Sequence, residues 1–213
     1  MTMNGYPVKA DENGVRGDHK VIASLVPDGA RVLDIGSADG ALLRLLTRIH
    51  DVDGRGIELS QDGVNRCVAD GLSVIQGDAD TDLVDYPDRA FDVVILSQTL
   101  QATRDPKGVM RELLRIGDQV IVSIPNFAFW RNRVQLLVRG RMPVTKYLPY
   151  EWYDTPNIHF CSLTDFAAMS KDLGAAIEKT VALSATGRRI PVPAPLGAWN
   201  FLAEQAVFLL RRT

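Results

Sequence analysis

Short runs of β-branched and aliphatic residues alternate with amphipathic stretches through the first half of the chain. Continuous apolar runs are typical of parallel strands buried on both faces, and apolar residues at helical spacing are typical of helices packed on one side. The pattern therefore predicts βα units and a parallel sheet. We expect strands at residues 31–35, 56–59, 72–76, 91–97 and 118–124, and helices at 18–25, 41–49, 61–70 and 107–116.

Polar residues suited to capping stand at three predicted helix starts. Ser60 precedes the helix at 61–70, and Asp105 is followed by a proline at a first helical position. Ser162 and Asp165 have the spacing of a capping box, with Asp in the place of the usual Glu or Gln. This third start predicts a further helix that ends at Leu173.

Two more strands are expected near the end of the chain, at residues 176–184 and 206–211. Three prolines lie between them: Pro191, Pro193 and Pro195. They predict a turn without a helix. The sequence thus predicts one α/β domain over residues 1–213, with a seven-stranded, mostly parallel sheet, helices on both faces and an antiparallel edge hairpin. Residues 126–160 interrupt the alternation after the fifth strand, and we expect them to form a cap or insertion.

The composition is that of an ordinary globular protein, with 46% hydrophobic and 23% charged residues. These fractions exclude a collagenous, disordered or low-complexity chain. Cys67 and Cys161 stand far apart, so neither a secreted disulfide framework nor a cysteine-rich zinc site is expected. No apolar run has the roughly 18 residues of a membrane span, and residues 1–9 lack a signal-peptide pattern. We therefore expect a cytoplasmic globular domain.

Charge is distributed unevenly along the chain, although the formal net charge is only −2. Residues 1–100 hold 17 acidic and 9 basic side chains, whereas residues 101–213 hold 9 acidic and 15 basic ones. Nucleic-acid-binding domains are usually basic overall, so nucleic acid is not an expected partner. The acidic first half disfavours a phosphate-rich ligand by charge repulsion.

The loop after the first predicted strand is the most informative segment. Residues 34–40 read Asp-Ile-Gly-Ser-Ala-Asp-Gly, so small residues join a strand to a helix. Such a loop lets a ligand approach backbone amides, but the G-x-G-x-x-G pattern of dinucleotide sites is absent. Asp34 and Asp39 would each oppose a phosphate by on the order of 1–4 kcal/mol. They favour a cation such as S-adenosylmethionine (SAM), which has a sulfonium and an ammonium group and no phosphate; a tight turn without a ligand is the alternative.

Acidic residues also stand at the ends of the next two predicted strands. Glu58 follows Asp34 by 24 residues, where an acid can accept hydrogen bonds from both ribose hydroxyls. Asp78 follows the third strand and is placed for an adenine amino group. Each acid alone is also consistent with a solvated strand end, but together they indicate one cofactor site. The predicted cofactor-binding residues are Asp34, Gly36, Ser37, Ala38, Asp39, Gly40, Glu58, Leu59, Gly77, Asp78, Ala79, Ser97 and Gln98.

These motifs resemble the class I SAM-dependent methyltransferase fold and, more narrowly, the methionine-biosynthesis protein family called MetW. The likeness is carried by residues 31–40, 91–106, 120–130 and 140–159, which include the unusual runs SQTLQATRDP and PYEWYDTPNIH. The resemblance implies a Rossmann-like methyltransferase fold that binds SAM or S-adenosylhomocysteine (SAH). It also implies a role beside the homoserine O-acyltransferase that opens methionine synthesis, and it supplies no methyl acceptor.

One position departs from the family pattern. The first motif of the family usually reads Gly-Cys-Gly-Asp-Gly, whereas residues 36–40 read Gly-Ser-Ala-Asp-Gly. Ala38 therefore adds a methyl group where the backbone should approach the methionine part of the cofactor. If this position requires a positive φ, the alanine also adds about 1 kcal/mol of strain or more.

The acceptor side of the site is less defined. No Asn-Pro-Pro-Tyr motif follows the fourth strand, and the chain lacks the Pro-Cys pair of covalent cytosine methylation. Gln98, Thr99 and Gln101 either hydrogen-bond a cofactor or acceptor or form a polar loop over the sheet edge. His159 and Tyr153 are the candidate catalytic residues, and a structural histidine bonded to a loop is the alternative for His159. No spacing of ligand residues predicts a metal site.

Residues 126–160 combine aromatic and basic side chains. They hold eight of the fifteen aromatic residues of the chain, together with Arg131, Arg133, Arg139, Arg141 and Lys146. Such a mixture suits an RNA, an anionic metabolite, a protein partner, or a cap whose aromatic residues form a small core. Val134, Leu136 and Leu137 alternate with polar residues as on a surface helix, which favours a cap or an interface over RNA.

Two functions from different classes remain open. In the first, the protein is a SAM-binding, methyltransferase-like protein of methionine biosynthesis that acts with homoserine O-acyltransferase and senses the cofactor. In the second, it is an active SAM-dependent methyltransferase for an unidentified small molecule, since methyl transfer needs little beyond positioning. The missing acceptor motif, Ala38 and the aromatic-basic segment favour the first function. The three strand-end acids indicate cofactor binding in both.

Overall fold

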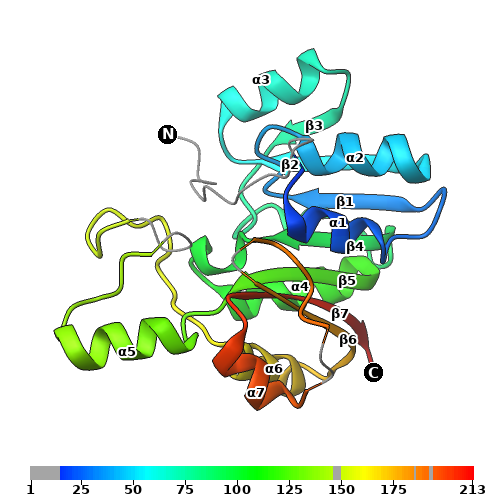
Figure 1. The fold of residues 1–213 in the computed structure, drawn as a ribbon. Helices are drawn as coiled ribbons and strands as arrows, with labels where there is room; N and C mark the ends of the chain where they lie inside the picture. Colours follow the sequence, from blue (N-terminus) through cyan, green and yellow to red (C-terminus); the bar gives the residue numbers. More distant parts are fainter. Residues whose placement is uncertain (1–14, 146–149, 185, 192–193) are drawn as a thin grey trace.

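The structure, a computed structural model, describes residues 15–145, 150–184, 186–191 and 194–213. The predictions made above for residues 1–9, Lys146 and Pro193 lie outside the described residues. Figure 1 shows a central sheet flanked by helices, with helix α5 (Trp130–Arg139) standing to one side of it.

Seven strands form the sheet in the order β3-β2-β1-β4-β5-β7-β6 (Figure 1). They are β1 Arg31–Ile35, β2 Asp53–Glu58, β3 Ser73–Gln76, β4 Phe91–Ser97, β5 Gly117–Pro125, β6 Ala175–Leu183 and β7 Gln205–Arg212. The strands from β3 to β5 in this order pair in parallel, and β7 is antiparallel to both β5 and β6. The predicted mostly parallel sheet with an antiparallel edge hairpin is thereby confirmed.

The helices follow the predicted pattern, and the predicted caps form. They are α1 Gly17–Ala23, α2 Ala41–His50, α3 Gln61–Ala69, α4 Pro106–Ile116, α5 Trp130–Arg139, α6 Leu163–Asp172 and α7 Leu196–Leu202. The Asp105 side chain accepts from the Gly108 N–H at 2.9 Å, which satisfies a free donor at the start of α4. Ser162 and Asp165 complete a capping box at the start of α6, as predicted.

Helix α7 shows that the prediction of a helix-free turn between the last two strands was wrong. Pro195, with φ −59°, stands at the N-cap of α7, so this proline introduces a helix. Asn200 of α7 accepts from the Leu163 N–H at 2.9 Å, and Leu196 and Trp199 pack against the core. A seven-residue helix offers too short an apolar pattern for periodicity to identify it.

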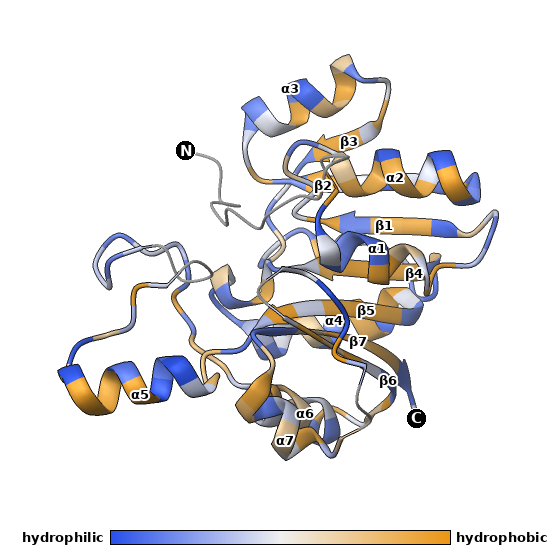
Figure 2. Ribbon diagram, in the orientation of Figure 1, coloured by the Kyte–Doolittle hydropathy of each residue, from blue (hydrophilic) through white to orange (hydrophobic). Residues whose placement is uncertain are grey.

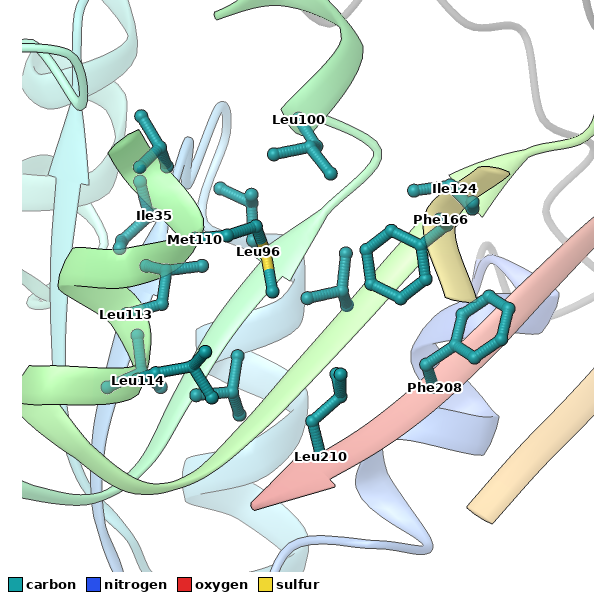
Figure 3. Packing of buried hydrophobic residues seen from close by; sticks show 14 of the residues in the cluster. Ile35, Leu96, Leu100, Met110, Leu113, Leu114, Ile124, Phe166, Phe208 and Leu210 are labelled. Atoms are coloured by element: carbon teal, nitrogen blue, oxygen red, sulfur yellow. The ribbon is translucent and has the colours of Figure 1, made fainter. Parts of the chain in front are cut away.

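Two apolar layers cover the two faces of the sheet. Along β5, Val120 and Val122 belong to the layer that also holds residues of α4 and α6, whereas Ile121 belongs to the layer with residues of α1 and α2. In the first layer the rings of Phe166 (α6) and Phe208 (β7) lie 4.6 Å apart (Figure 3). Each fully buried aliphatic or aromatic side chain contributes about 1.5–3 kcal/mol. Because both faces are covered, most residues in the middle of the central strands are hydrophobic, as Figure 2 shows.

Candidate cofactor site

The carboxyl ends of β1 to β4 border a cavity of about 320 Å³. Ile35 of β1 lies beside Ile57 of β2 in the sheet register, so the loop after β1 begins next to Glu58. Both isoleucines line the cavity, as do residues of the loops after β3 and β4. Open parallel sheets bind their ligands at this edge, which makes the cavity the candidate site.

Part of the predicted cofactor site lines this cavity directly. Its predicted lining residues are Gly36, Glu58, Leu59, Gly77, Asp78 and Ala79. The remaining predicted residues are not among the described residues that line it: Asp34, Ser37, Ala38, Asp39, Gly40, Ser97 and Gln98. Thr99, Thr103 and Arg104 also line the cavity, which shows that the start of the β4–α4 connection closes one side of it.

Glu58 is held in a fixed orientation at the end of β2. It is 4% exposed, its Oε2 accepts from the Ala38 N–H at 2.8 Å, and its Oε1 accepts from the Ser60 N–H at 2.9 Å. Each carboxylate oxygen has a further lone pair, so both can still accept from ligand hydroxyl groups. The carboxylate is therefore oriented before a ligand arrives.

Gly63 of α3 makes the position of Glu58 possible, and sequence reasoning missed it. A Cβ atom at Gly63 would lie 2.7 Å from Cγ of Glu58 and 2.8 Å from the carbonyl oxygen of Ala38. Real Cβ atoms do not approach other atoms this closely, so the loop or the side chain would have to move. A glycine inside a predicted helix gives no local sign of this tertiary contact.

Ala38 has φ +54°, in the left-handed region that favours glycine. The condition for strain at this position is therefore met, at a cost of about 1 kcal/mol relative to glycine. Its neighbours Gly36 and Gly40 have φ +77° and +73°. Asp39 is exposed, and its Oδ1 accepts from the Ala41 N–H at 3.1 Å at the start of α2. The carboxylates of Glu58 and Asp39 thus hold the loop in a conformation that suits glycine better than alanine.

Asp34 is buried at the end of β1 with one oxygen unpaired. It is 1% exposed, and no described residue hydrogen-bonds to its Oδ1. Burial raises the pKa of Asp34 to about 7, while a hydrogen bond from Ser37 and the charge of Arg16 act in the opposite direction. An unsatisfied buried carboxyl group is costly, so this atom is suited to a cationic or N–H-donating group of a ligand.

An ion pair from the start of α1 joins the ends of β4 and β5, and sequence reasoning missed it as well. Arg16 pairs with Asp18 at 2.6 Å, and Asp18 is fully buried. Asp18 also accepts from the hydroxyl groups of Ser97 and Ser123, at 3.1 Å each. Burial raises the pKa of Asp18, but the charges of Arg16 and His19 and the hydrogen bonds from Arg16 and Ser123 together leave it below its usual value. The predicted site residue Ser97 is thus engaged within the protein.

Asp78 and Asp80 tie the loop after β3 to the loop after β4. Asp78 pairs with Arg104 through Oδ2 and accepts from the Asp80 N–H through Oδ1 at 2.9 Å. Asp80 accepts from the backbone N–H groups of Arg104 and Asp105, at 2.9 and 3.0 Å. Because both oxygens of Asp78 are engaged, an adenine amino group would share this carboxylate with Arg104.

Gln98 adopts an unusual backbone conformation directly after β4. Its φ is +52°, it is buried, and its Nε2 donates to Oε1 of Gln205 at 2.6 Å. Its side-chain oxygen has no hydrogen-bond partner among the described residues. Gln101 donates from Nε2 to the Gln98 carbonyl at 2.7 Å. Strained polar residues of this kind cluster at functional sites.

The two candidate catalytic residues are not among the described residues that line the cavity. His159 donates from its backbone N–H to the Gln101 carbonyl at 3.0 Å, and its ring Nε2 lies 3.4 Å from the Arg104 carbonyl. Tyr153 is exposed. Their catalytic roles stay predictions, and the contacts of His159 are those of a residue that bonds a loop.

Residues 126–160, the segment that carries α5, leave the core and return to it at nearly the same point. The rings of Phe127 and Phe160 stack with centroids 4.7 Å apart, and the Phe127 N–H donates to the Cys161 carbonyl at 3.1 Å. Near its end, Pro156 and Ile158 line the cavity. The part of the segment that meets the candidate site is therefore this stretch, and no residue of α5 is among the described lining residues.

The described residues contain no group of three or more His, Cys, Asp or Glu side chains suited to a metal ion. Cys67 and Cys161 are free, and burial raises the pKa of Cys161 to about 11, so its thiol stays protonated at neutral pH. None of the described helices is long and apolar enough to cross a membrane.

Solved structures share this architecture at low sequence identity. A SAM-dependent methyltransferase from Mesorhizobium loti matches with a TM-score of 0.68 and 18% identity, over 94% of this chain and 99% of that chain. A SAM-dependent methyltransferase from Archaeoglobus fulgidus matches with a TM-score of 0.62 and 14% identity, over 91% of this chain and 94% of that chain. The fold is therefore that of the class I SAM-dependent methyltransferases.

Within this class, the chain belongs to the family of the methionine biosynthesis protein MetW, whose model matches residues 16–210. A bifunctional methionine biosynthesis protein MetXA/MetW from Rhodopirellula baltica is 30% identical over 97% of this chain. The chain spans 34% of the length of that relative. The resemblance stated from the sequence is confirmed, and with it a methyltransferase-like protein of methionine biosynthesis.

Proposed function

We propose that this protein binds SAM or SAH in the cavity at the ends of β1 to β4 and acts with a homoserine O-acyltransferase. The observation that carries cofactor binding is Oδ1 of Asp34, which has no hydrogen-bond partner among the described residues. This buried carboxyl group directly precedes the cavity-lining residues Ile35 and Gly36. A positively charged ligand group would supply its missing partner. SAM has two such groups and no phosphate that the surrounding carboxylates would repel.

The residues present fit this ligand in charge and in hydrogen-bonding capacity. Glu58, oriented by two backbone N–H groups, would accept from the ribose hydroxyls. Asp78 would accept from the adenine amino group beside Arg104. Asp34 would face the positively charged methionine end, next to the loop at 36–40. When bound, SAM supplies an electrophilic methyl group, whereas the protein holds and orients the ligand.

The Rhodopirellula baltica relative supports the partnership with a second methionine-biosynthesis protein. It is described as bifunctional, MetXA/MetW, so a MetW part and another part share one chain, of which the present chain corresponds to about a third. In the proposed role the protein reports the concentration of SAM, the end product of the pathway, to the acyltransferase. Binding of SAM and binding of the enzyme are then two coupled equilibria.

A second function, methyl transfer to a small molecule, is favoured by one observation. Gln98, directly after β4, combines a left-handed backbone, burial and a side-chain oxygen without a hydrogen-bond partner among the described residues. Such a group could position an acceptor, and positioning is the main requirement of methyl transfer. Formation of SAH from SAM in the presence of small-molecule acceptors, without the acyltransferase, would support this function.

The test measures the rate of the purified acyltransferase with and without the full chain, at several SAM concentrations. The proposal is supported if the acyltransferase rate changes when the protein is added and, with the protein present, changes with the SAM concentration. Calorimetric titration with SAM and SAH tests cofactor binding separately, with Asp34→Asn as the variant that removes the proposed charge. A rate indifferent to the chain at every SAM concentration refutes the partnership, and absence of binding in both titrations refutes the cofactor.

A further inference from the structure

Helix α5 exposes its apolar residues and buries a polar one. Leu137 is 85% and Val138 is 75% exposed, and Val134 is also exposed. Leu137 and Val138 lie three and four positions after Val134, so the three residues form one face of the helix. Asn132 is the buried residue of α5. Figures 1 and 2 show α5 clear of the sheet, with hydrophobic residues on its surface.

The contacts that attach α5 to the rest of the protein are polar and come from the first turn of the helix. Asn132 donates from Nδ2 to the Phe127 carbonyl at 3.0 Å. Arg133 donates to the Ala128 carbonyl at 2.5 Å, and its guanidinium lies 5.7 Å from the ring centroid of Phe201. Asn132 is two positions from Val134, which places it on roughly the opposite side from the apolar face. The apolar face is thus directed away from the protein's own core.

A helix arranged in this way needs a partner. Helices of about ten residues are marginal in water and usually gain stability by burying an apolar face. A contiguous exposed apolar face bordered by polar residues marks a surface that interacts with a protein or a membrane. In helix-in-groove recognition, an amphipathic helix lays residues at i, i+3 and i+4 into a groove of its partner, which is the spacing of Val134, Leu137 and Val138.

The charges around this face indicate what the partner surface carries. Residues 126–150 contain five basic residues and no acidic one. Arg131, Arg133 and Arg139 of α5 are exposed, as is Arg141 after it. If two copies of the chain paired through this face about a two-fold axis, arginines would oppose arginines, which is unfavourable. The complementary surface is an apolar groove with carboxylates on its rim.

We propose that the face of α5 formed by Val134, Leu137 and Val138 docks into such a groove on the homoserine O-acyltransferase. This inference rests on the proposed function, since it assigns the surface through which the proposed partner binds. The stacked pair Phe127 and Phe160 closes the base of the segment, so α5 can engage a partner without disturbing the sheet. The same segment reaches the cavity at Pro156 and Ile158, which gives the docking surface a covalent connection to the cofactor site.

The test compares the affinity of full-length variants for the purified acyltransferase. The double variant Leu137→Glu/Val138→Glu places two carboxylates in the proposed groove. The matched control Val68→Glu/Val84→Glu makes the same charge change at residues that are 55% and 68% exposed on α3 and after β3. We expect the α5 variant to lose at least about tenfold in affinity and the control to stay within about twofold. The affinity for SAH and the melting temperature verify that both variants are folded. If Leu137→Glu/Val138→Glu does not fold, Arg131→Glu/Arg139→Glu takes its place.

Four results would overturn the inference, and they differ in whether the proposed function also fails. Equal affinity of parent, control and α5 variants places the interface elsewhere and leaves the proposed function intact. Absence of any complex with the parent removes both this inference and the proposed partnership. A parent dimer that becomes a monomer in the α5 variant, measured by light scattering, assigns the face to a second copy. Binding of the parent, but not of the α5 variant, to vesicles of phosphatidylserine and phosphatidylcholine assigns it to a membrane surface.

Discussion

The sheet edge at the ends of β1 and β2 buries carboxyl groups, whereas α5 exposes aliphatic side chains. Asp34 and Glu58 are 1% and 4% exposed, while Leu137 and Val138 are 85% and 75% exposed. Most folded proteins arrange these residue types the other way round. Buried polar groups with open hydrogen-bonding capacity suit a small ligand, and exposed apolar groups suit a protein surface. The two regions therefore indicate two different binding events on one chain.

The two regions also differ in how firmly the protein itself holds them. Glu58 is fixed by the N–H groups of Ala38 and Ser60, and Gly63 leaves room for its side chain. Helix α5 is attached by a few polar contacts at one end of the molecule. A site whose side chains are already oriented binds a small ligand without a large ordering cost. When each ligand is titrated in the absence of the other, variants in each region should therefore affect one binding event and spare the other.

Replacing Glu58 should have the largest effect on the ligand site. Glu58→Ala removes the charged acceptor and also leaves the N–H groups of Ala38 and Ser60 without their partner. We expect SAM and SAH affinity to fall by about 1–3 kcal/mol, with a loss of thermal stability. Calorimetry and thermal melting measure the two effects. Glu151→Ala, at an exposed acid of the α5-carrying segment, is the control, and unchanged affinity in Glu58→Ala would remove Glu58 from the site.

Filling the space at Gly63 should have a smaller effect of the same kind. The Cβ of Gly63→Ala would press against Glu58 and the Ala38 carbonyl, so we expect a stability loss of about 1–2 kcal/mol and weaker SAH binding. Gly197→Ala is the matched control, because a Cβ there meets no atom within 4 Å. The comparison by chemical unfolding and calorimetry would be contradicted if both alanine variants behaved alike.

The raised pKa of Asp34 predicts that ligand binding depends on pH. Burial raises this pKa to about 7, so Asp34 becomes negatively charged as the pH passes that value. His19, whose pKa burial lowers to about 4, stays neutral above pH 5. We expect SAM affinity to rise by about tenfold between pH 5.5 and 7.5 in parallel calorimetric titrations. In Asp34→Asn this rise should disappear, and an unchanged rise would assign it to another group.

The raised pKa of Asp34 also determines whether stability rises or falls with pH when no ligand is bound. The pKa of Asp34 in the folded protein lies above the unfolded value of about 4, so the folded state binds more protons between pH 4 and 7. The contribution of Asp34 to the free energy of unfolding therefore falls as the pH rises through this window. The melting temperature of Asp34→Asn, relative to the parent, should accordingly be higher at pH 8 than at pH 5.

Much of the fold follows from periodicity, because the central strands are buried on both faces. β1 and β4 have the bounds that their apolar runs predict. β2 begins at Asp53, before the predicted start at residue 56, because its first residues pair with β1 although they are polar or small. α7 was missed because a proline followed by seven residues gives little periodic signal. Local pattern thus predicts elements that bury a long apolar run and misses those that depend on pairing or on short packing contacts.

The residues of the candidate site also fall into two groups, those that the sequence reveals and those that only the structure reveals. The strand-end acids Asp34, Glu58 and Asp78 could be found, because strand ends of a parallel sheet meet at one edge. Arg16 and Asp18 could not, because their partner Ser97 is distant in the sequence and only the folded chain brings them together. The sequence gives no local sign of this role, because the burial of Asp18 in α1 is apparent only in the structure.

Replacing Ala38 should have the smallest effect, and its sign tests how far the ligand site departs from its best geometry. Ala38→Gly removes about 1 kcal/mol of strain at φ +54°, but it also increases the freedom of the unfolded chain by a comparable amount. Thermal stability should therefore change little. The affinity for SAM and SAH should stay equal or increase, because the methyl group leaves the loop that lies beside the ligand while the N–H bond to Glu58 is kept. A clear loss of affinity would show that the alanine methyl contacts the ligand favourably. The affinity for the acyltransferase, which we assign to α5, should not change in this variant.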